Sequence, residues 1–112
     1  MLYTTFTVKD TDYKLRLGAK SCVDLEKKLG TNPVNVLVAI AEQNKVPSLS
    51  TLLTIIHASM VQYQHGITMD KVYEIYEDYA EEGHNMLELV PVIMEIFKNA
   101  GLIPDEDEEG KN

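Results

Sequence analysis

The sequence has one cysteine, Cys22, and one arginine, Arg16, among its 112 residues. A single cysteine excludes an intrachain disulfide and a metal site built from several thiolates. Nucleic-acid binding needs lysine and arginine gathered on one face to displace counterions from phosphates. Here the 10 basic residues are scattered, 18 acidic residues outnumber them, and the formal net charge is −8. The sequence therefore predicts no binding to nucleic acid and no attraction to anionic membrane surfaces.

Long apolar runs are also missing. No stretch reaches the roughly 20 apolar residues that span a bilayer. The opening MLYTTFTVKD does not have the basic segment and apolar run of a signal peptide. We therefore expect no membrane contact and a cytoplasmic location. Apolar residues make up 45% and charged residues 25%, as in an ordinary globular protein, and the length suits one domain.

Two alternating patterns open the sequence. Phe6 and Val8 alternate with threonines, and the segment from Tyr13 to Leu17 alternates again after an Asp-Thr-Asp turn. This arrangement predicts a β-hairpin over about residues 3–17. A lone hairpin is marginally stable in water, so we expect helices to cover its apolar face.

Helical spacing begins at about residue 21. Ser21 and Asp24, three residues apart, have the order of a capping box, and Gly30 is suited to end this first helix. The next segment, from Val34 to Ala41, is almost wholly apolar. It predicts a central, buried helix.

Three further helices are expected, each preceded by a residue that starts or limits a helix: Pro47, Thr68 and Asn85. Pro91 lies within the last of them and predicts a kink or a later start. The predicted fold is α+β, mostly α: an N-terminal β-hairpin followed by about five helices over residues 21–101. We expect residues 1–103 to form one compact globular domain and the acidic segment 104–112 to be disordered.

One surface is a candidate for binding a partner. The last predicted helix is apolar around much of its circumference, which indicates either deep burial or cover by another protein. Both interpretations stay open at this point. The candidate contact residues lie on the last two helices: Met69, Tyr73, Leu89, Val92 and Ile96.

No group of residues predicts catalysis. His57, His65 and His84 lack the spacing of a metal-ligand motif. Cys22 falls on the apolar face of its helix, which favours a core residue over a nucleophile. The segment from Asp105 begins like a calcium-binding loop, but the glutamate that such a loop needs at its twelfth position is missing. We therefore expect a protein that is not an enzyme and that has no cofactor and no metal.

The order of several segments resembles a known family. They are YKLRL in the hairpin, DLEKKLG at the end of the first helix, NPVNVL, the PSL break, GITMDKVYEIYEDYAEEGHNMLEL and the closing KNAGLI. This order is similar to that of the small tail assembly chaperones of long-tailed bacteriophages and prophages, particularly those of Gram-positive hosts. The similarity covers about residues 3–103 and rests on order and spacing, because no single motif is diagnostic.

The resemblance implies a non-catalytic function in the cytoplasm of a bacterial host cell. Such chaperones bind the long, helical and aggregation-prone tape measure protein, keep it soluble, and help the tail-tube protein to polymerise around it. Members of the family also self-associate, so a homo-oligomer is a further expectation. Two alternatives stay open: an acidic helical adaptor or inhibitor protein, and a minor structural tail or connector protein.

Overall fold

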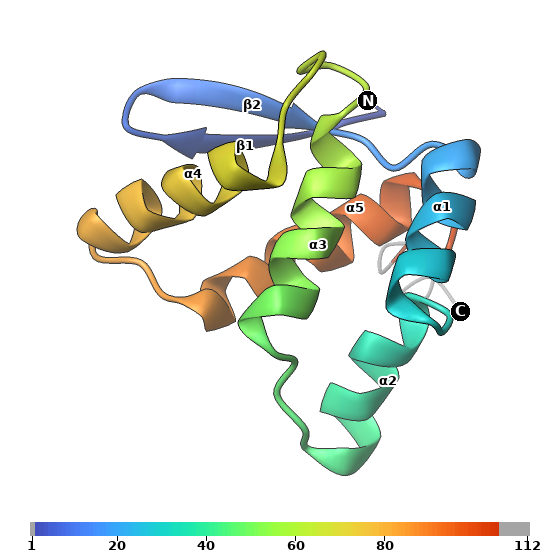
Figure 1. Ribbon diagram of the computed structural model, residues 1–112. Coiled ribbons are helices and arrows are strands. Elements are labelled where there is room, and N and C mark those ends of the chain that lie inside the picture. The colour runs from blue at the N-terminus through green and yellow to red at the C-terminus, as the bar shows by residue number, and fades with distance from the viewer. Residues whose placement is uncertain (1, 106–112) are drawn as a thin grey trace.

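The computed structural model describes residues 2–105. In this part of the chain two strands precede five α-helices: β1 (Thr4–Val8), β2 (Thr11–Leu15), α1 (Ala19–Leu29), α2 (Val34–Gln43), α3 (Leu49–Met60), α4 (Met69–Glu81) and α5 (Leu89–Asn99), with a short 3₁₀ helix, η1 (Met86–Glu88), before α5. The hairpin lies along one edge of the helices, α3 runs through the middle, and α2 lies at the end opposite the hairpin (Figure 1). The predicted α+β, mostly α fold is confirmed. The predicted acidic segment 104–112 falls outside the described residues beyond Asp105.

The hairpin follows from the alternation in its two strands. Thr4, Phe6 and Val8 of β1 are buried, and the residues between them are exposed. Because side chains alternate between the two faces of a strand, one face of the hairpin packs on the helices and the other meets solvent. Leu15 of β2 lies opposite Thr4 and is fully buried.

The hairpin turn lies earlier than the sequence indicated. Lys9 and Asp10 occupy the turn with φ angles of 49° and 65°, and Val8 pairs with Thr11 across it. Two left-handed central residues match the twist of the flanking strands. The Asp-Thr-Asp segment therefore contributes only its first residue to the turn, and Thr11 begins β2.

The core is organised around α3, which packs against α1, α4, α5 and β2. Seven α3 residues are buried: Leu52, Leu53, Ile55, Ile56, Ala58, Ser59 and Met60. The Arg16 N–H donates to the Ser59 carbonyl at 2.7 Å. The Gln64 amide donates to the Lys14 carbonyl and accepts from the Lys14 N–H, at 3.0 and 2.9 Å. These bonds cover the outer edge of β2, which would otherwise be open to another strand.

The helix ends agree with the sequence at most positions. The Thr68 hydroxyl caps α4 by accepting from the Lys71 N–H at 3.1 Å, and Gly30 closes α1 at φ 71°. Pro91 lies in the first turn of α5, where a missing N–H is tolerated, so the later start is the correct alternative. The α3 helix ends at Met60.

The predicted Ser21 cap is wrong. The α1 helix begins at Ala19, and Gly18 precedes it in extended conformation without any side-chain cap. The chain leaves the hairpin after Leu15 and enters the helix at Ala19, so Ser21 lies inside the first turn. Asp24 pairs instead with Lys20, at 3.2 Å between carboxylate and ammonium.

The predicted central position of α2 is also wrong. This helix has no buried residue, although seven of its ten residues are apolar. The central position belongs to α3, because α3 contacts the hairpin and three of the other helices, α1, α4 and α5. The apolar run therefore identified a helix correctly but not its environment.

Candidate partner-binding surface

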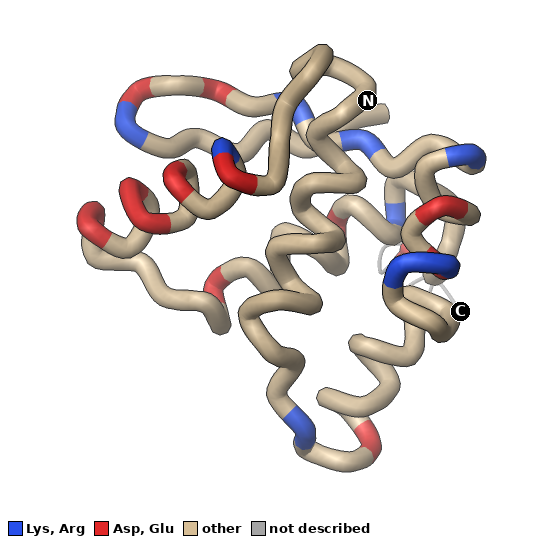
Figure 2. The backbone as a smooth tube through the Cα atoms, in the orientation of Figure 1, with Lys and Arg blue, Asp and Glu red and all other residues tan. Residues whose placement is uncertain are grey.

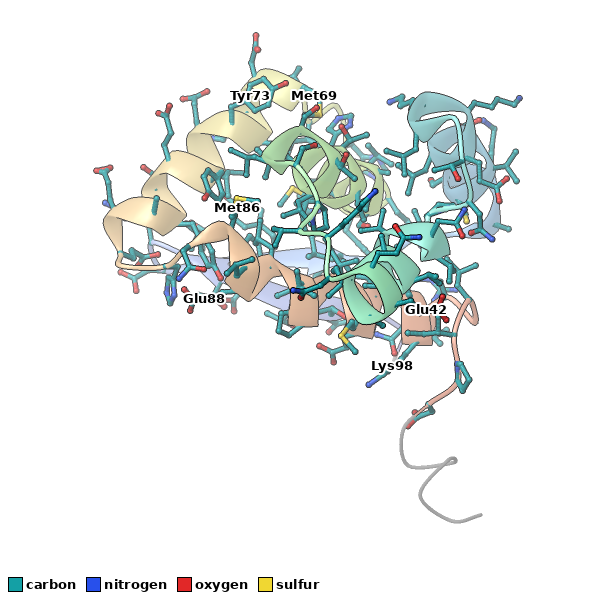
Figure 3. The ribbon with its side chains drawn as sticks, turned by 90° about the horizontal axis from the view of Figure 1, so that it is seen from below. Glu42, Met69, Tyr73, Met86, Glu88 and Lys98 are labelled. Carbon is teal, nitrogen blue, oxygen red and sulfur yellow. The ribbon has the colours of Figure 1, made fainter. Side chains whose placement is uncertain are left out.

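The structure separates the five residues predicted as a contact surface. Leu89 and Ile96 are each only 1% exposed and belong to the core. Met69 and Val92 are partly buried and pack against that core. Tyr73 is 48% exposed and lies with Met69 on α4 (Figure 3). Of the five, only Tyr73 is therefore exposed to solvent and accessible to a partner.

A different apolar surface lies around α2. A groove of about 300 Å³ is formed by the end of α1, one side of α2, the loop after it and the first turn of α3. We call it the α2 groove and define it by its lining residues: Leu29, Thr31, Asn35, Val36, Ala39, Lys45, Val46, Pro47 and Thr51. A volume of this size is at the small end of ligand sites and suits a few apolar side chains.

Local hydrogen bonds set the entrance to α2. The Asn32 side chain accepts from the Val34 N–H at 3.0 Å, which satisfies one of the unpaired donors at the start of the helix. The Asn35 amide donates to the Thr31 hydroxyl at 2.8 Å. Two groove residues are thus held to one another where the chain enters α2.

A second set of bonds ends α2 and starts α3. Asn44 adopts the left-handed conformation at φ 52°, and the Lys45 N–H donates to the Ala39 carbonyl at 3.1 Å. The chain then passes through Val46 and Pro47 to Ser48, whose hydroxyl caps α3. Pro47 cannot continue a helix from the preceding segment. The short loop between α2 and α3 forms one wall of the α2 groove.

The surface around α2 leaves large apolar side chains in solvent. Val46 in the groove is 61% exposed, and Val38 on α2 is 38% exposed. The helix is attached to the rest of the domain by Val36 and Leu37, which pack against the core from one side only. Val46 therefore gives the groove an apolar side chain that is open to solvent and that another molecule could cover.

Charge is distributed unevenly around the molecule. Acidic positions repeat along the outer face of α4, whereas the loop after α2 carries a basic one (Figure 2). Of the residues that the structure describes, Lys45 is the only charged one that lines the α2 groove. Glu42, the only acidic residue of α2, is exposed and lies outside the lining.

Comparison with known families gives one match, over residues 2–111, to DUF6096, described as a family of unknown function. The chain belongs to DUF6096. No curated protein and no solved structure matches it.

The histidines of this DUF6096 chain serve the fold in two places. His57 Nε2 donates to the Ile67 carbonyl at 2.9 Å and holds the loop before α4 against α3. The His84 ring stacks on Tyr79 at 4.4 Å between centroids. Among residues 2–105, no three His, Cys, Asp or Glu side chains come together in a way that could hold a metal ion.

Cys22 is buried in the DUF6096 fold, as the core interpretation predicted. Burial raises the pKa of its thiol, and the nearby Glu26 carboxylate raises it further. Both effects disfavour the thiolate, which is the nucleophilic form.

Within the described part of the chain, no helix is long and apolar enough to cross a bilayer.

Sequence reasoning missed the α2 groove because it assigned α2 to the interior of this DUF6096 domain. The signal was present in the two proline-containing boundaries, Asn32-Pro33 and Val46-Pro47. They isolate a short apolar helix between two sharp turns. What they do not determine is which face of that helix the remaining chain covers.

Proposed function

We propose that this protein is a tail assembly chaperone that binds a tape measure protein through the α2 groove and the adjoining Val38. In this function it has no catalytic step. It holds the client soluble in the bacterial cytoplasm and promotes assembly of the tail tube around it. The order of sequence segments that resembles such chaperones supports the proposal, and the unburied apolar surface of α2 carries it structurally.

A helical client suits this surface physically. An amphipathic helix binds by placing its apolar face in a groove and leaving its polar face in solvent. Covering a large apolar side chain contributes about 1.5–3 kcal/mol, so Val38, Val46 and the client's own side chains supply a useful binding energy. The net charge of −8 then keeps the complex soluble.

The acidic face of α4 favours a second candidate, an adaptor or inhibitor that covers a basic partner. Six acidic residues lie on α4 or directly after it: Asp70, Glu74, Glu77, Asp78, Glu81 and Glu82. Such a protein would bind through α4 and not through α2.

A minor tail or connector protein, by contrast, would remain in finished particles, which a chaperone leaves.

The test is co-expression with the tape measure protein encoded in the same phage or prophage genome. Val38→Asp and Val46→Asp each place a charge on the α2 surface. Val23→Asp is the matched control, because Val23 is 49% exposed on α1 and does not line the groove. We expect the wild type and the control to keep the client soluble and to co-purify with it. The two α2 variants should recover at least tenfold less client.

Three results would contradict this proposal. Equal recovery with the α2 variants and the control would remove α2 as the binding surface. Loss of a partner only on replacing Glu77 and Glu81 by lysine would favour the acidic adaptor. Retention of the protein in finished particles would favour the connector.

A further inference from the structure

Lys45 brings a basic side chain to the α2 groove. Among residues 2–105 it is the one charged residue that lines the α2 groove, and the polar residues beside it are neutral. Lys9 and Lys20 each face a carboxylate, at 4.0 and 3.2 Å. No such ion pair joins Lys45 to Glu42 or to any other acidic residue between residues 2 and 105.

The backbone holds Lys45 at the rim of the groove. Its N–H is bound to the carbonyl of Ala39, which itself lines the groove, and Asn44 before it has the left-handed conformation that ends α2. The exposed side chain of Lys45 therefore extends from a backbone segment whose course is fixed by the end of α2. An apolar groove with a single cation at its rim is complementary to an apolar group with a carboxylate beside it.

We infer that the α2 groove selects an amphipathic helix that carries a carboxylate next to its apolar face, and that Lys45 recognises this carboxylate. The inference rests on the proposed function, since it specifies the chemistry of the client helix. On a helix, residues three or four positions apart are neighbours, so an Asp or Glu at that spacing from a buried side chain reaches the rim. A lysine at the same place would face Lys45 and be disfavoured.

The net charge of the protein acts against this preference at long range. At −8 the molecule repels an acidic peptide and attracts a basic one regardless of the groove. The local effect of Lys45 must therefore be separated from a general change in charge. Lys71 provides the matched control, because it is an exposed lysine on α4, and Lys71→Glu changes the net charge as much as Lys45→Glu does.

The experiment uses two synthetic amphipathic helices with the same leucine face, one flanked by glutamate and the other by lysine. Their affinities are measured by fluorescence anisotropy with the full-length wild type, Lys45→Glu and Lys71→Glu. Relative to the control, Lys45→Glu should weaken the glutamate peptide by about two- to fivefold and strengthen the lysine peptide by a similar factor. Circular dichroism of each variant checks that the helices are retained.

The same effect of Lys45→Glu and Lys71→Glu on both peptides would overturn the inference. Val46→Asp should abolish binding of the glutamate peptide, and unchanged binding would show that the peptide lies elsewhere and would also overturn it. Sedimentation of the wild type tests a further occupant. If the protein self-associates and Val46→Asp dissociates it, a second copy covers the groove and the inference fails.

Failure of the inference and failure of the proposed function give different results. If Val46→Asp loses the tape measure protein but Lys45→Glu retains it and shows no charge preference, the chaperone function stands and the charge selection is wrong. If the peptides show the Lys45 preference but the tape measure protein does not co-purify, the selection stands and the chaperone function is wrong.

Discussion

At the scale of single residues, Glu88 joins the end of α4 to the start of the last helical segment. Its carboxylate accepts from the Asn85 N–H at 2.7 Å and from the His84 imidazole at 3.1 Å, and His84 stacks on Tyr79 of α4. The hydrogen bond from His84, followed by that from the Asn85 N–H, lowers the pKa of Glu88 below its ordinary value. The charged carboxylate is therefore more stable in the folded than in the unfolded chain.

The Glu88→Gln variant tests this contribution through its pH dependence. Since the folded pKa is the lower one, the stabilisation is complete above the ordinary carboxyl pKa of about 4.3 and is lost as pH falls through the folded pKa. We expect Glu88→Gln to melt at a lower temperature than the wild type at pH 7, with a gap that closes on acidification to pH 3. Thermal melts across this range measure the gap. A gap that stays constant would show that the charge of Glu88 has no part in it, and Glu74→Gln serves as an exposed control.

Residue spacing predicted some of these contacts and missed others. The helix start at Asn85 and the cap at Thr68 could be predicted, because a side-chain cap depends on neighbours within one turn. The Ser21 cap could not be excluded on the same grounds, since Ser21 and Asp24 have the right spacing but the tertiary path of the chain starts α1 earlier. The stacking of His84 on Tyr79 depends on how α4 ends, which spacing does not specify.

At the scale of elements, α2 and α3 form an informative pair. Both are rich in apolar residues, yet α3 buries seven residues and α2 buries none. Periodicity shows which side chains gain from burial, whereas the packing of the whole chain decides which helix occupies the centre. For this reason the helices and the hairpin were predictable from sequence, and the α2 groove was not.

This difference predicts unequal local stability. The amides of α2 should exchange with solvent at least about tenfold faster than those of α3, because few buried contacts oppose local opening of α2. Hydrogen exchange followed by mass spectrometry measures both helices in one sample. Addition of the proposed client should slow exchange in α2 more than in the buried middle of α3. Equal protection of the two helices in the absence of a client would contradict the description of α2 as a peripheral element.

At the scale of the whole molecule, a single core joins the hairpin to the helices. Phe6 of β1, Leu25 of α1 and Phe97 of α5 all belong to the same buried cluster, and α3 contacts β2, α1 and α5. The sequence predicted this arrangement as one domain, but it left open whether Leu89 and Ile96 face the core or a partner. Their exposure of 1% places them in the core.

Ile96→Ala tests that placement for the molecule as a whole. Removing a buried isoleucine side chain should lower the free energy of unfolding by about 2–5 kcal/mol, since a cavity remains where the side chain was. Val92→Ala, at a partly buried position one turn away, should cost less. Urea unfolding followed by circular dichroism and by tyrosine fluorescence should give coincident transitions, because helices and hairpin share one core. If Ile96→Ala instead left stability unchanged and weakened client binding, Ile96 would belong to a contact surface and the single-core description would be wrong.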